Sequence, residues 1–261
     1  ILRKNYHDQL TLSTLYAYSE HYILTLGSRD VGSLEEFMAK LPGDEKQKLA
    51  QVREAYSYMM VHPGCKMMAP GAAIPEELGK CIQALNTLYK SSPALYQMDD
   101  EYDGFEWVQL MKYEENVITF LRKTEKPEET LLVICNFAAI PYENYQVGVP
   151  FAGKYKEIFN SDAVEFGGEG VVNSRVKTAK AEECDEREYS IKVKLPALGV
   201  SIYSCTPGKA PARKKVTAAK TAKNKTAKDK TAKDKTAGKL VRTVKAKTPA
   251  KKSVKEEKAT K

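Results

Sequence analysis

The chain has 261 residues, 42% of them hydrophobic, which is enough material for one or two packed domains. Its net charge of +8 is unevenly spread: 18 Lys and 2 Arg against 4 acidic residues give residues 206–261 a charge of +16, which leaves residues 1–205 at −8. No stretch approaches the roughly 20 consecutive apolar residues of a membrane span, and no signal peptide is visible, so we expect no membrane partner. The five scattered cysteines form no C-x-x-C pair, which argues against a zinc site or a disulfide framework and favours the cytoplasm.

The first hundred residues alternate between helical and extended patterns. Apolar positions recur at helical spacing, and Pro-Gly-Asp and Pro-Glu-Glu mark two helix starts. We expect a helix over 6–18, a strand over 21–26, a helix from about 42 to 61, a strand over 65–71 and a helix over 75–91. Strand and helix in alternation predict a β/α unit with parallel strands, and two strands alone do not make such a sheet stable.

From residue 105 onward the pattern is all-β. Short runs rich in β-branched and aromatic residues are separated by turn residues, and several alternate apolar with polar side chains. We expect strands over 105–113, 116–124, 130–138, 145–150, 154–162, 189–196 and 199–205. This spacing predicts an antiparallel sandwich of roughly 100 residues that buries its own core.

The C-terminal tail, residues 206–261, is built around a near-repeat of Lys, Thr and Ala between Lys220 and Lys239. It contains too few apolar side chains to offset the entropy of ordering it, so we expect it to be disordered. Binding to a polyanion by counterion release is one interpretation, and a solubilising or tethering role is the other. No aromatic residue interleaves the lysines, so base stacking is not supported.

Several stretches of residues 1–205 resemble the C-terminal third of bacterial glycogen branching enzymes, in the order of that family. They are YHDQLTLSTLYAYSEHYILTL (6–26), LPGDEKQKLAQVREAYSYMMVHPGCKMM (41–68), YDGFEW (102–107), VICNF (133–137), YKEIFNSDAVEFGG (155–168) and LPALGVSIY (195–203). The resemblance implies an α/β part followed by an all-β part. Residues 1–98 would be the remnant of an α-amylase-like (β/α)8 barrel, residues 104–205 a C-terminal β-sandwich, and residues 206–261 the tail. A partial barrel exposes strand edges and apolar helix faces, so we expect residues 1–98 to be unstable or sticky without a partner.

The family resembled cuts an α-1,4 linkage and transfers the released glucan to a 6-hydroxyl through a covalent intermediate. Such retaining chemistry uses two carboxyl groups about 5 Å apart, at the C-terminal face of the barrel, and the resemblance implies no metal or redox cofactor. The family motifs for the nucleophile and the acid would lie upstream of Ile1, and the chain starts without Met, which favours a piece of a longer protein.

A third carboxylate of the family lies in a Ser-His-Asp-Glu-Val-Val-His-Gly motif, and Asp30 occupies its place within GSRDVGS (27–33). Both motif histidines and the glutamate are missing, and a guanidinium does not replace an imidazole without a change of shape and charge. The loop after the next barrel strand is also shortened, at MAPGAAIPEE (68–77). We therefore interpret Asp30 as a vestigial transition-state carboxylate rather than a working one.

Other residues admit two interpretations each. His7 and Asp8 are read as a helix start, with a substrate role as the alternative, and Trp107 as a core aromatic, with stacking on a glucose ring as the alternative. The adjacent acidic pairs at 35–36, 76–77 and 128–129 are read as solvated faces or helix-start charges. No Gly-rich phosphate loop, H-E-x-x-H or Gly-x-Ser-x-Gly motif is present.

Two hypotheses about function follow. In the first, the chain is the C-terminal portion of a 1,4-α-glucan branching enzyme and is inactive alone. In the second, it is a non-catalytic protein in which the sandwich binds α-glucan or a partner enzyme and the tail tethers it.

Overall fold

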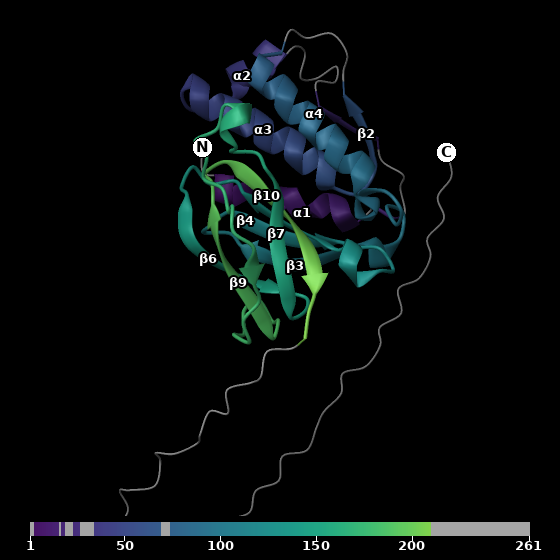
Figure 1. The fold of residues 1–261 in the computed structure, drawn as a ribbon. Coiled ribbons are helices and arrows are strands. Elements are labelled where there is room, and N and C mark those ends of the chain that lie inside the picture. Colours follow the sequence, from purple (N-terminus) through teal and green to yellow (C-terminus); the bar gives the residue numbers. More distant parts are fainter. Residues whose placement is uncertain (1–2, 16, 19–22, 27–33, 69–73, 210–261) are drawn as a thin grey trace, which may run out of the picture. The chain divides into compact units, whose positions relative to one another are not determined.

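A six-stranded antiparallel sheet forms the centre of the structure (Figure 1). The computed structural model describes residues 3–209 except 16, 19–22, 27–33 and 69–73. In the order of the sheet, the strands are β3 (Phe105–Lys112), β4 (Val117–Arg122), β5 (Leu131–Asn136), β10 (Gly199–Pro207), β7 (Gly153–Asn160) and β8 (Lys177–Thr178). A second antiparallel sheet pairs β6 (Tyr142–Val149) with β9 (Tyr189–Leu195). The predicted antiparallel sandwich is confirmed, and only the two-residue strand β8 was not predicted.

Both faces of the large sheet are buried, and they face different partners. On β4, Ile118 and Phe120 face a core shared with the helices, whereas Val117 and Leu121 face a core shared with β6 and β9. Successive side chains of a strand point to opposite faces of the sheet, and on β4 the side chains on both faces are apolar. The sandwich therefore buries one core by itself, and its second core needs the helices, which the sequence analysis did not anticipate.

Two long helices, α3 (Glu45–Val61) and α4 (Glu76–Ser91), lie side by side over the large sheet (Figure 1). The Asp44 carboxylate accepts a hydrogen bond from the Gln47 N–H, and the Gln47 side chain accepts one from the Asp44 N–H, so α3 begins with a capping box. Helix α4 begins directly after Pro75, with Glu76 and Glu77 in its first turn, where carboxylates complement the helix dipole. Both helices lie where the sequence predicted them.

The strands β1 (Ile23–Leu26) and β2 (Cys65–Met68) pair in parallel and form a two-stranded sheet of their own. The helix α2 (Leu34–Lys40) lies between them in sequence, and we did not predict it. A signal for it was present, because Ser33 followed by Glu36 matches the capping-box pattern. The predicted parallel strands are confirmed, and the side chains of Ile23 and Met67 are exposed.

The prediction of one continuous helix over residues 6–18 is wrong. The described residues form a 3-10 turn (Arg3–Tyr6), one turn of α-helix, α1 (Gln9–Leu12), and a second 3-10 turn (Ser13–Leu15). A turn at His7 and Asp8 interrupts the helix, because the His7 side chain is buried against the β3–β4 hairpin. Tertiary hydrogen bonds override the helical pattern here.

Short 3-10 turns complete the described elements, at Pro93–Leu95, Tyr102–Gly104, Pro127–Glu129 and Val164–Phe166. The described residues form one compact unit. Among the described residues, no helix is long and apolar enough to cross a membrane. The division of the chain at residues 98, 104 and 206 stays a prediction, and the tail beyond Lys209 lies outside the described residues.

Candidate functional site

Asp30 lies outside the described residues, but the strand that precedes its segment is described. The register pairs Leu26 with Met68, so β1 and β2 end at the same edge of their parallel sheet. The GSRDVGS segment follows β1, and the shortened MAPGAAIPEE segment begins at the end of β2. The two segments that the resemblance assigns to the glucan site therefore leave from neighbouring strand ends, the edge at which parallel β/α folds place their sites.

His7 accepts a hydrogen bond from the Leu10 N–H through its carbonyl, so it takes part in a helix start as predicted, and its side chain is also a buried tertiary anchor. Its side chain is 1% exposed. Nδ1 lies 2.8 Å from Asn116 Oδ1, and Nε2 lies 2.9 Å from the Leu110 carbonyl oxygen. The carbonyl of Asp8 does accept hydrogen bonds from the N–H groups of Thr11 and Leu12, so Asp8 is part of a helix start. Both nitrogens of the His7 ring are thus engaged with the β3–β4 hairpin.

Trp107 packs against the core shared by the helices and the large sheet, as predicted. Its ring meets Phe105 and Phe120 edge-on, at centroid distances of 4.9 and 5.6 Å. Its Nε1–H points toward the Thr14 hydroxyl, 3.4 Å away. Edge-to-face packing of this kind stabilises a core, so the structure supports the packing interpretation.

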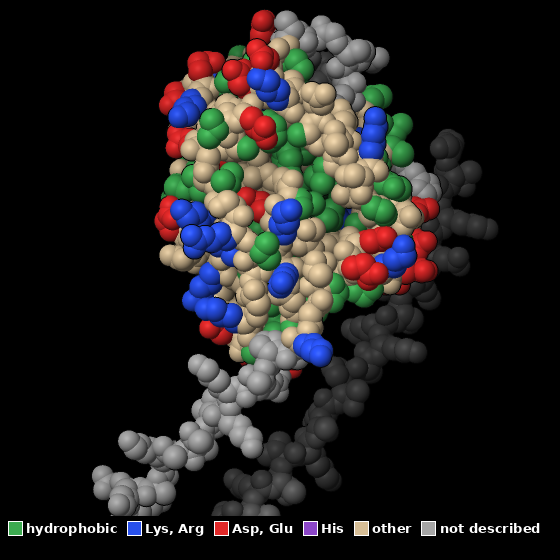
Figure 2. All heavy atoms as spheres, viewed as in Figure 1, with side chains coloured by type: hydrophobic (Ala, Val, Ile, Leu, Met, Phe, Trp, Pro, Cys, Tyr) green, Lys and Arg blue, Asp and Glu red, His purple; other side chains and the backbone are tan. Residues whose placement is uncertain are grey.

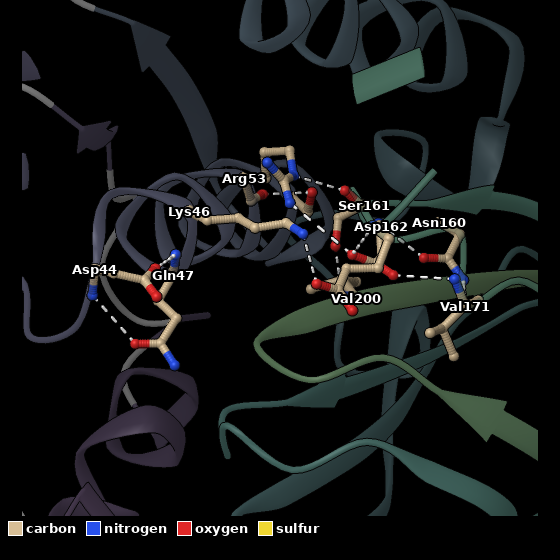
Figure 3. A network of polar contacts seen from close by, with 11 residues as sticks. Asp44, Lys46, Gln47, Arg53, Asn160, Ser161, Asp162, Val171 and Val200 are labelled. Atoms are coloured by element: carbon tan, nitrogen blue, oxygen red, sulfur yellow. Dashed lines mark hydrogen bonds and ion pairs between the residues drawn. The ribbon is translucent and has the colours of Figure 1, made fainter. Parts of the chain in front are cut away.

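The Asp162 side chain organises the loop that follows β7 (Figure 3). Oδ1 accepts a hydrogen bond from the Glu169 N–H, and Oδ2 accepts one from the Val171 N–H, both at 3.0 Å. The Asp162 carbonyl accepts a third from the Gly170 N–H at 2.8 Å. A single buried carboxylate therefore fixes the backbone of residues 162–171, and a backbone amide is the natural partner of such a group.

Arg53 joins this loop to the middle of α3 (Figure 3). It is 4% exposed, its Nε–H donates to the Ser161 carbonyl at 2.8 Å, and Nη2 lies 4.0 Å from Asp162 Oδ1. At the solvent end of the same helix, Lys46 Nζ lies 2.7 Å from Glu169 Oε1. Helix α3 thus presents two cationic side chains to two of the carboxylates of this loop, Asp162 and Glu169.

A second charged cluster lies where β2 begins. Arg122, which is fully buried, donates to the Val61 carbonyl through Nη1 at 2.8 Å and pairs with Asp99 through Nη2 at 2.5 Å. The other oxygen of Asp99 accepts from the Gly64 N–H at 2.9 Å and lies 3.4 Å from Lys66 Nζ. Burial lowers the pKa of Lys66 to about 8, although Asp99 opposes this shift. Because the cluster bonds the C-terminal turn of α3 to β4, its role is structural.

A large groove runs between α4 and the strands β7 and β10, with a volume of about 950 Å3 (Figure 2). Its floor includes Phe159 and Phe166, and its rim carries hydroxyl and carboxylate side chains such as Thr87, Glu129 and Glu157. Apolar surface bordered by hydrogen-bonding groups suits a carbohydrate chain, whose rings have C–H faces and hydroxyl edges.

The reactivity of the cysteines tests the packing of the described core. Cys65 is exposed, whereas Cys81, Cys135 and Cys205 are buried, and burial raises the pKa of Cys81 to about 12. Because the thiolate is the reactive form, we expect one thiol, Cys65, to react rapidly with a disulfide reagent at pH 8 and the buried ones to react only after unfolding. The half-buried Cys184, whose pKa burial raises to about 11, should react slowly. Cys65→Ser should abolish the fast phase, and a fast phase that survives it would contradict the described fold.

Comparison with known proteins defines the class of the β-domain first. Residues 107–206 match the family described as "Alpha amylase, C-terminal all-beta domain". The matched residues cover nearly all of the two antiparallel sheets. This part of the chain is therefore a C-terminal domain of the α-amylase class, as the strand pattern and the resemblance predicted.

The similarity to curated proteins is more specific and extends to the helices. The chain is 37% identical over 225 residues to the 1,4-alpha-glucan branching enzyme of Oceanobacillus iheyensis, which covers 78% of this chain and 35% of that enzyme. It is 32% identical over 222 residues to the enzyme of Bacillus caldolyticus, which covers 77% of this chain and 33% of that enzyme. The chain is thus related to the bacterial branching enzymes and corresponds to a C-terminal portion of them, about a third of their length. The resemblance stated from the sequence motifs is confirmed.

A solved structure of the debranching enzyme of Nostoc punctiforme is also similar, at 16% identity and a TM-score of 0.45, over 70% of this chain and 35% of that one.

Proposed function

We propose that this chain works as the C-terminal portion of a cytoplasmic 1,4-α-glucan branching enzyme and does not branch glucan alone. The observation that carries the proposal is the parallel pair β1–β2, which is joined through α3 and α4 to a β-domain of the α-amylase class. The similarity to branching enzymes over 77–78% of the chain supports the same assignment.

In this proposal the chain supplies structure and part of the glucan surface rather than the reacting carboxylates. Retaining transfer needs a nucleophile and an acid about 5 Å apart at the C-terminal face of the barrel, and the resemblance assigns both to barrel strands that precede β1. The segment that holds Asp30 follows the end of β1 in the sequence but lacks the histidines and the glutamate of the family motif. We therefore propose that Asp30 takes no part in the chemistry.

The test is complementation with the portion of the Oceanobacillus relative that this chain does not match. The full chain alone, mixed with amylose, should leave iodine staining unchanged and form no α-1,6 linkages. Addition of the barrel portion should restore branching, and Asp30→Ala should reduce the restored rate by less than about twofold, since a residue outside the chemistry contributes little transition-state stabilisation.

Two controls make the result decisive. The barrel portion alone must be inactive, and a chain that carries a core substitution must fail to complement it. Branching by the chain alone that Asp30→Ala abolishes would refute both the proposed role and the interpretation of Asp30.

The second candidate is a non-catalytic protein that binds α-glucan. The groove of about 950 Å3 beside α4 favours it, together with the charge of +16 on residues 206–261. Under this proposal the described domain sediments with glycogen by itself. Removal of residues 210–261, which keeps β10 whole, should leave glycogen binding intact and abolish binding to a polyanion such as DNA, which must also weaken steeply with salt. Loss of glycogen binding on removal of the tail would contradict the assignment of the glucan surface to the β-domain.

A further inference from the structure

A second, smaller cavity lies between the N-terminal half of α3 and the Asp162 loop, with a volume of about 290 Å3. Its walls come from segments far apart in the sequence: Ala50 and Arg53 on α3, Asp162 and Glu169 on the loop after β7, and Pro141 and Leu198 on the β-domain. We name it the Arg53 pocket. Its volume is at the lower end of the range of small-molecule sites, which suits a single ring rather than a chain.

The guanidinium of Arg53 is the group that points to a ligand. The side chain is 5% exposed, and its Nε–H is bonded to the Ser161 carbonyl. Among the described residues, neither Nη1 nor Nη2 makes a hydrogen bond, and the nearest carboxylate oxygen, on Asp162, lies 4.0 Å from Nη2. That Asp162 carboxylate is already engaged by two backbone N–H groups. A guanidinium has five N–H donors, so this buried side chain still has donors to offer at the pocket.

The other groups of the pocket determine which ligand fits. Three carboxylates, on Asp44, Asp162 and Glu169, accompany the two cationic side chains of Lys46 and Arg53. A phosphate or another anion would be repelled by these carboxylates, whereas a sugar hydroxyl can donate to a carboxylate and accept from a guanidinium at once. The alanine, proline and leucine side chains of the wall offer contacts to the C–H groups of a sugar ring.

We infer that the Arg53 pocket binds one neutral glucosyl unit, with the Arg53 guanidinium as its anchoring donor. The choice of a glucosyl unit among neutral sugars rests on the proposed function. The pocket and the large groove share no lining residue, although residues of the segment 160–172 line both cavities.

The test is a calorimetric titration of the full chain with maltose. We expect a dissociation constant in the millimolar range, on the order of −4 kcal/mol, because a small neutral ligand makes few contacts. Ala50→Leu fills the pocket with a good helix former and removes no hydrogen bond, so it should weaken binding by about tenfold or more. Ala39→Leu, an equal change of volume at an exposed position of α2 that lines neither cavity, is the matched control and should change the affinity by less than about twofold.

The outcomes separate this inference from the proposed function. Absence of maltose binding up to about 50 mM, equal binding by the Ala50→Leu variant, or an equal loss of binding in the Ala39→Leu variant would each overturn the Arg53 pocket as a sugar site. Both variants should unfold at midpoint temperatures within a few degrees of that of the unsubstituted chain. This result excludes misfolding as the cause of lost binding. Complementation of the barrel portion is measured on the same proteins, so a chain that complements but binds no maltose refutes this inference alone.

Discussion

Replacement of Arg122 by methionine should lower the free energy of unfolding by about 3 to 5 kcal/mol, as expected when one partner of a buried ion pair is removed. The guanidinium is fully buried and bonds both the Asp99 carboxylate and the carbonyl of Val61 at the end of α3. Methionine keeps the length of the side chain but offers no donor, so both acceptors lose a partner. Urea titration, followed by the fluorescence of the single tryptophan, measures the loss.

The matched control for Arg122 is Arg175→Met. Arg175 is exposed, so the same chemical change at that position should cost less than about 0.5 kcal/mol. Equal costs at the two positions would show that the Arg122–Asp99 pair does not stabilise the junction between α3 and β4. The double variant Arg122→Met, Asp99→Asn should cost less than the sum of the single changes, because the two groups contact each other.

Phe120→Ala should cost about 3 to 5 kcal/mol, since it removes a fully buried ring and leaves a cavity between the helices and the large sheet. The ring stacks on Phe105 at a centroid distance of 5.0 Å and meets Trp107 edge-on. Its loss should therefore also change the emission of Trp107 in the folded state. The same urea titration measures both effects.

Ile118→Val is the control for the Phe120 experiment, because Ile118 is equally buried and faces the same core from the same strand. It removes one methylene group and should cost only about 0.5 to 1.5 kcal/mol. A cost for Phe120→Ala no larger than that of the control would mean that α3 and α4 do not cover this face of the sheet in solution.

The regular elements could be predicted because their signals are local. The apolar spacing of α3, its Asp44 start and its end before Pro63 are all readable within 20 residues, and the structure confirms them. The strands of the β-domain alternate or are wholly apolar over short runs bounded by turn residues, so all of them except the two-residue β8 were also readable, with approximate limits. Local signals of this kind do not report which faces meet, so the core that the helices share with the sheet could not be derived.

The polar contacts that position the candidate site could not be predicted, because they join residues far apart in the chain. Arg53 bonds Ser161, and His7 lies against Asn116, across separations of 108 and 109 residues. Arg53 falls next to Val52 on α3, where the helical pattern alone assigns a charged residue to the solvent side, yet it is 4% exposed. The one site residue that motif comparison supplied, Asp30, lies outside the described residues and stays a prediction.

The core shared by α3, α4 and the large sheet also governs how this kind of chain can be divided. A polypeptide cut between α4 and β3 would expose Leu85 and Leu88 on one product and Phe120, Val133 and Phe159 on the other. Neither product keeps the apolar partner that excluded water from its face. We therefore expect the helices and the β-domain to fold and unfold as one cooperative unit, although the family match begins only at residue 107.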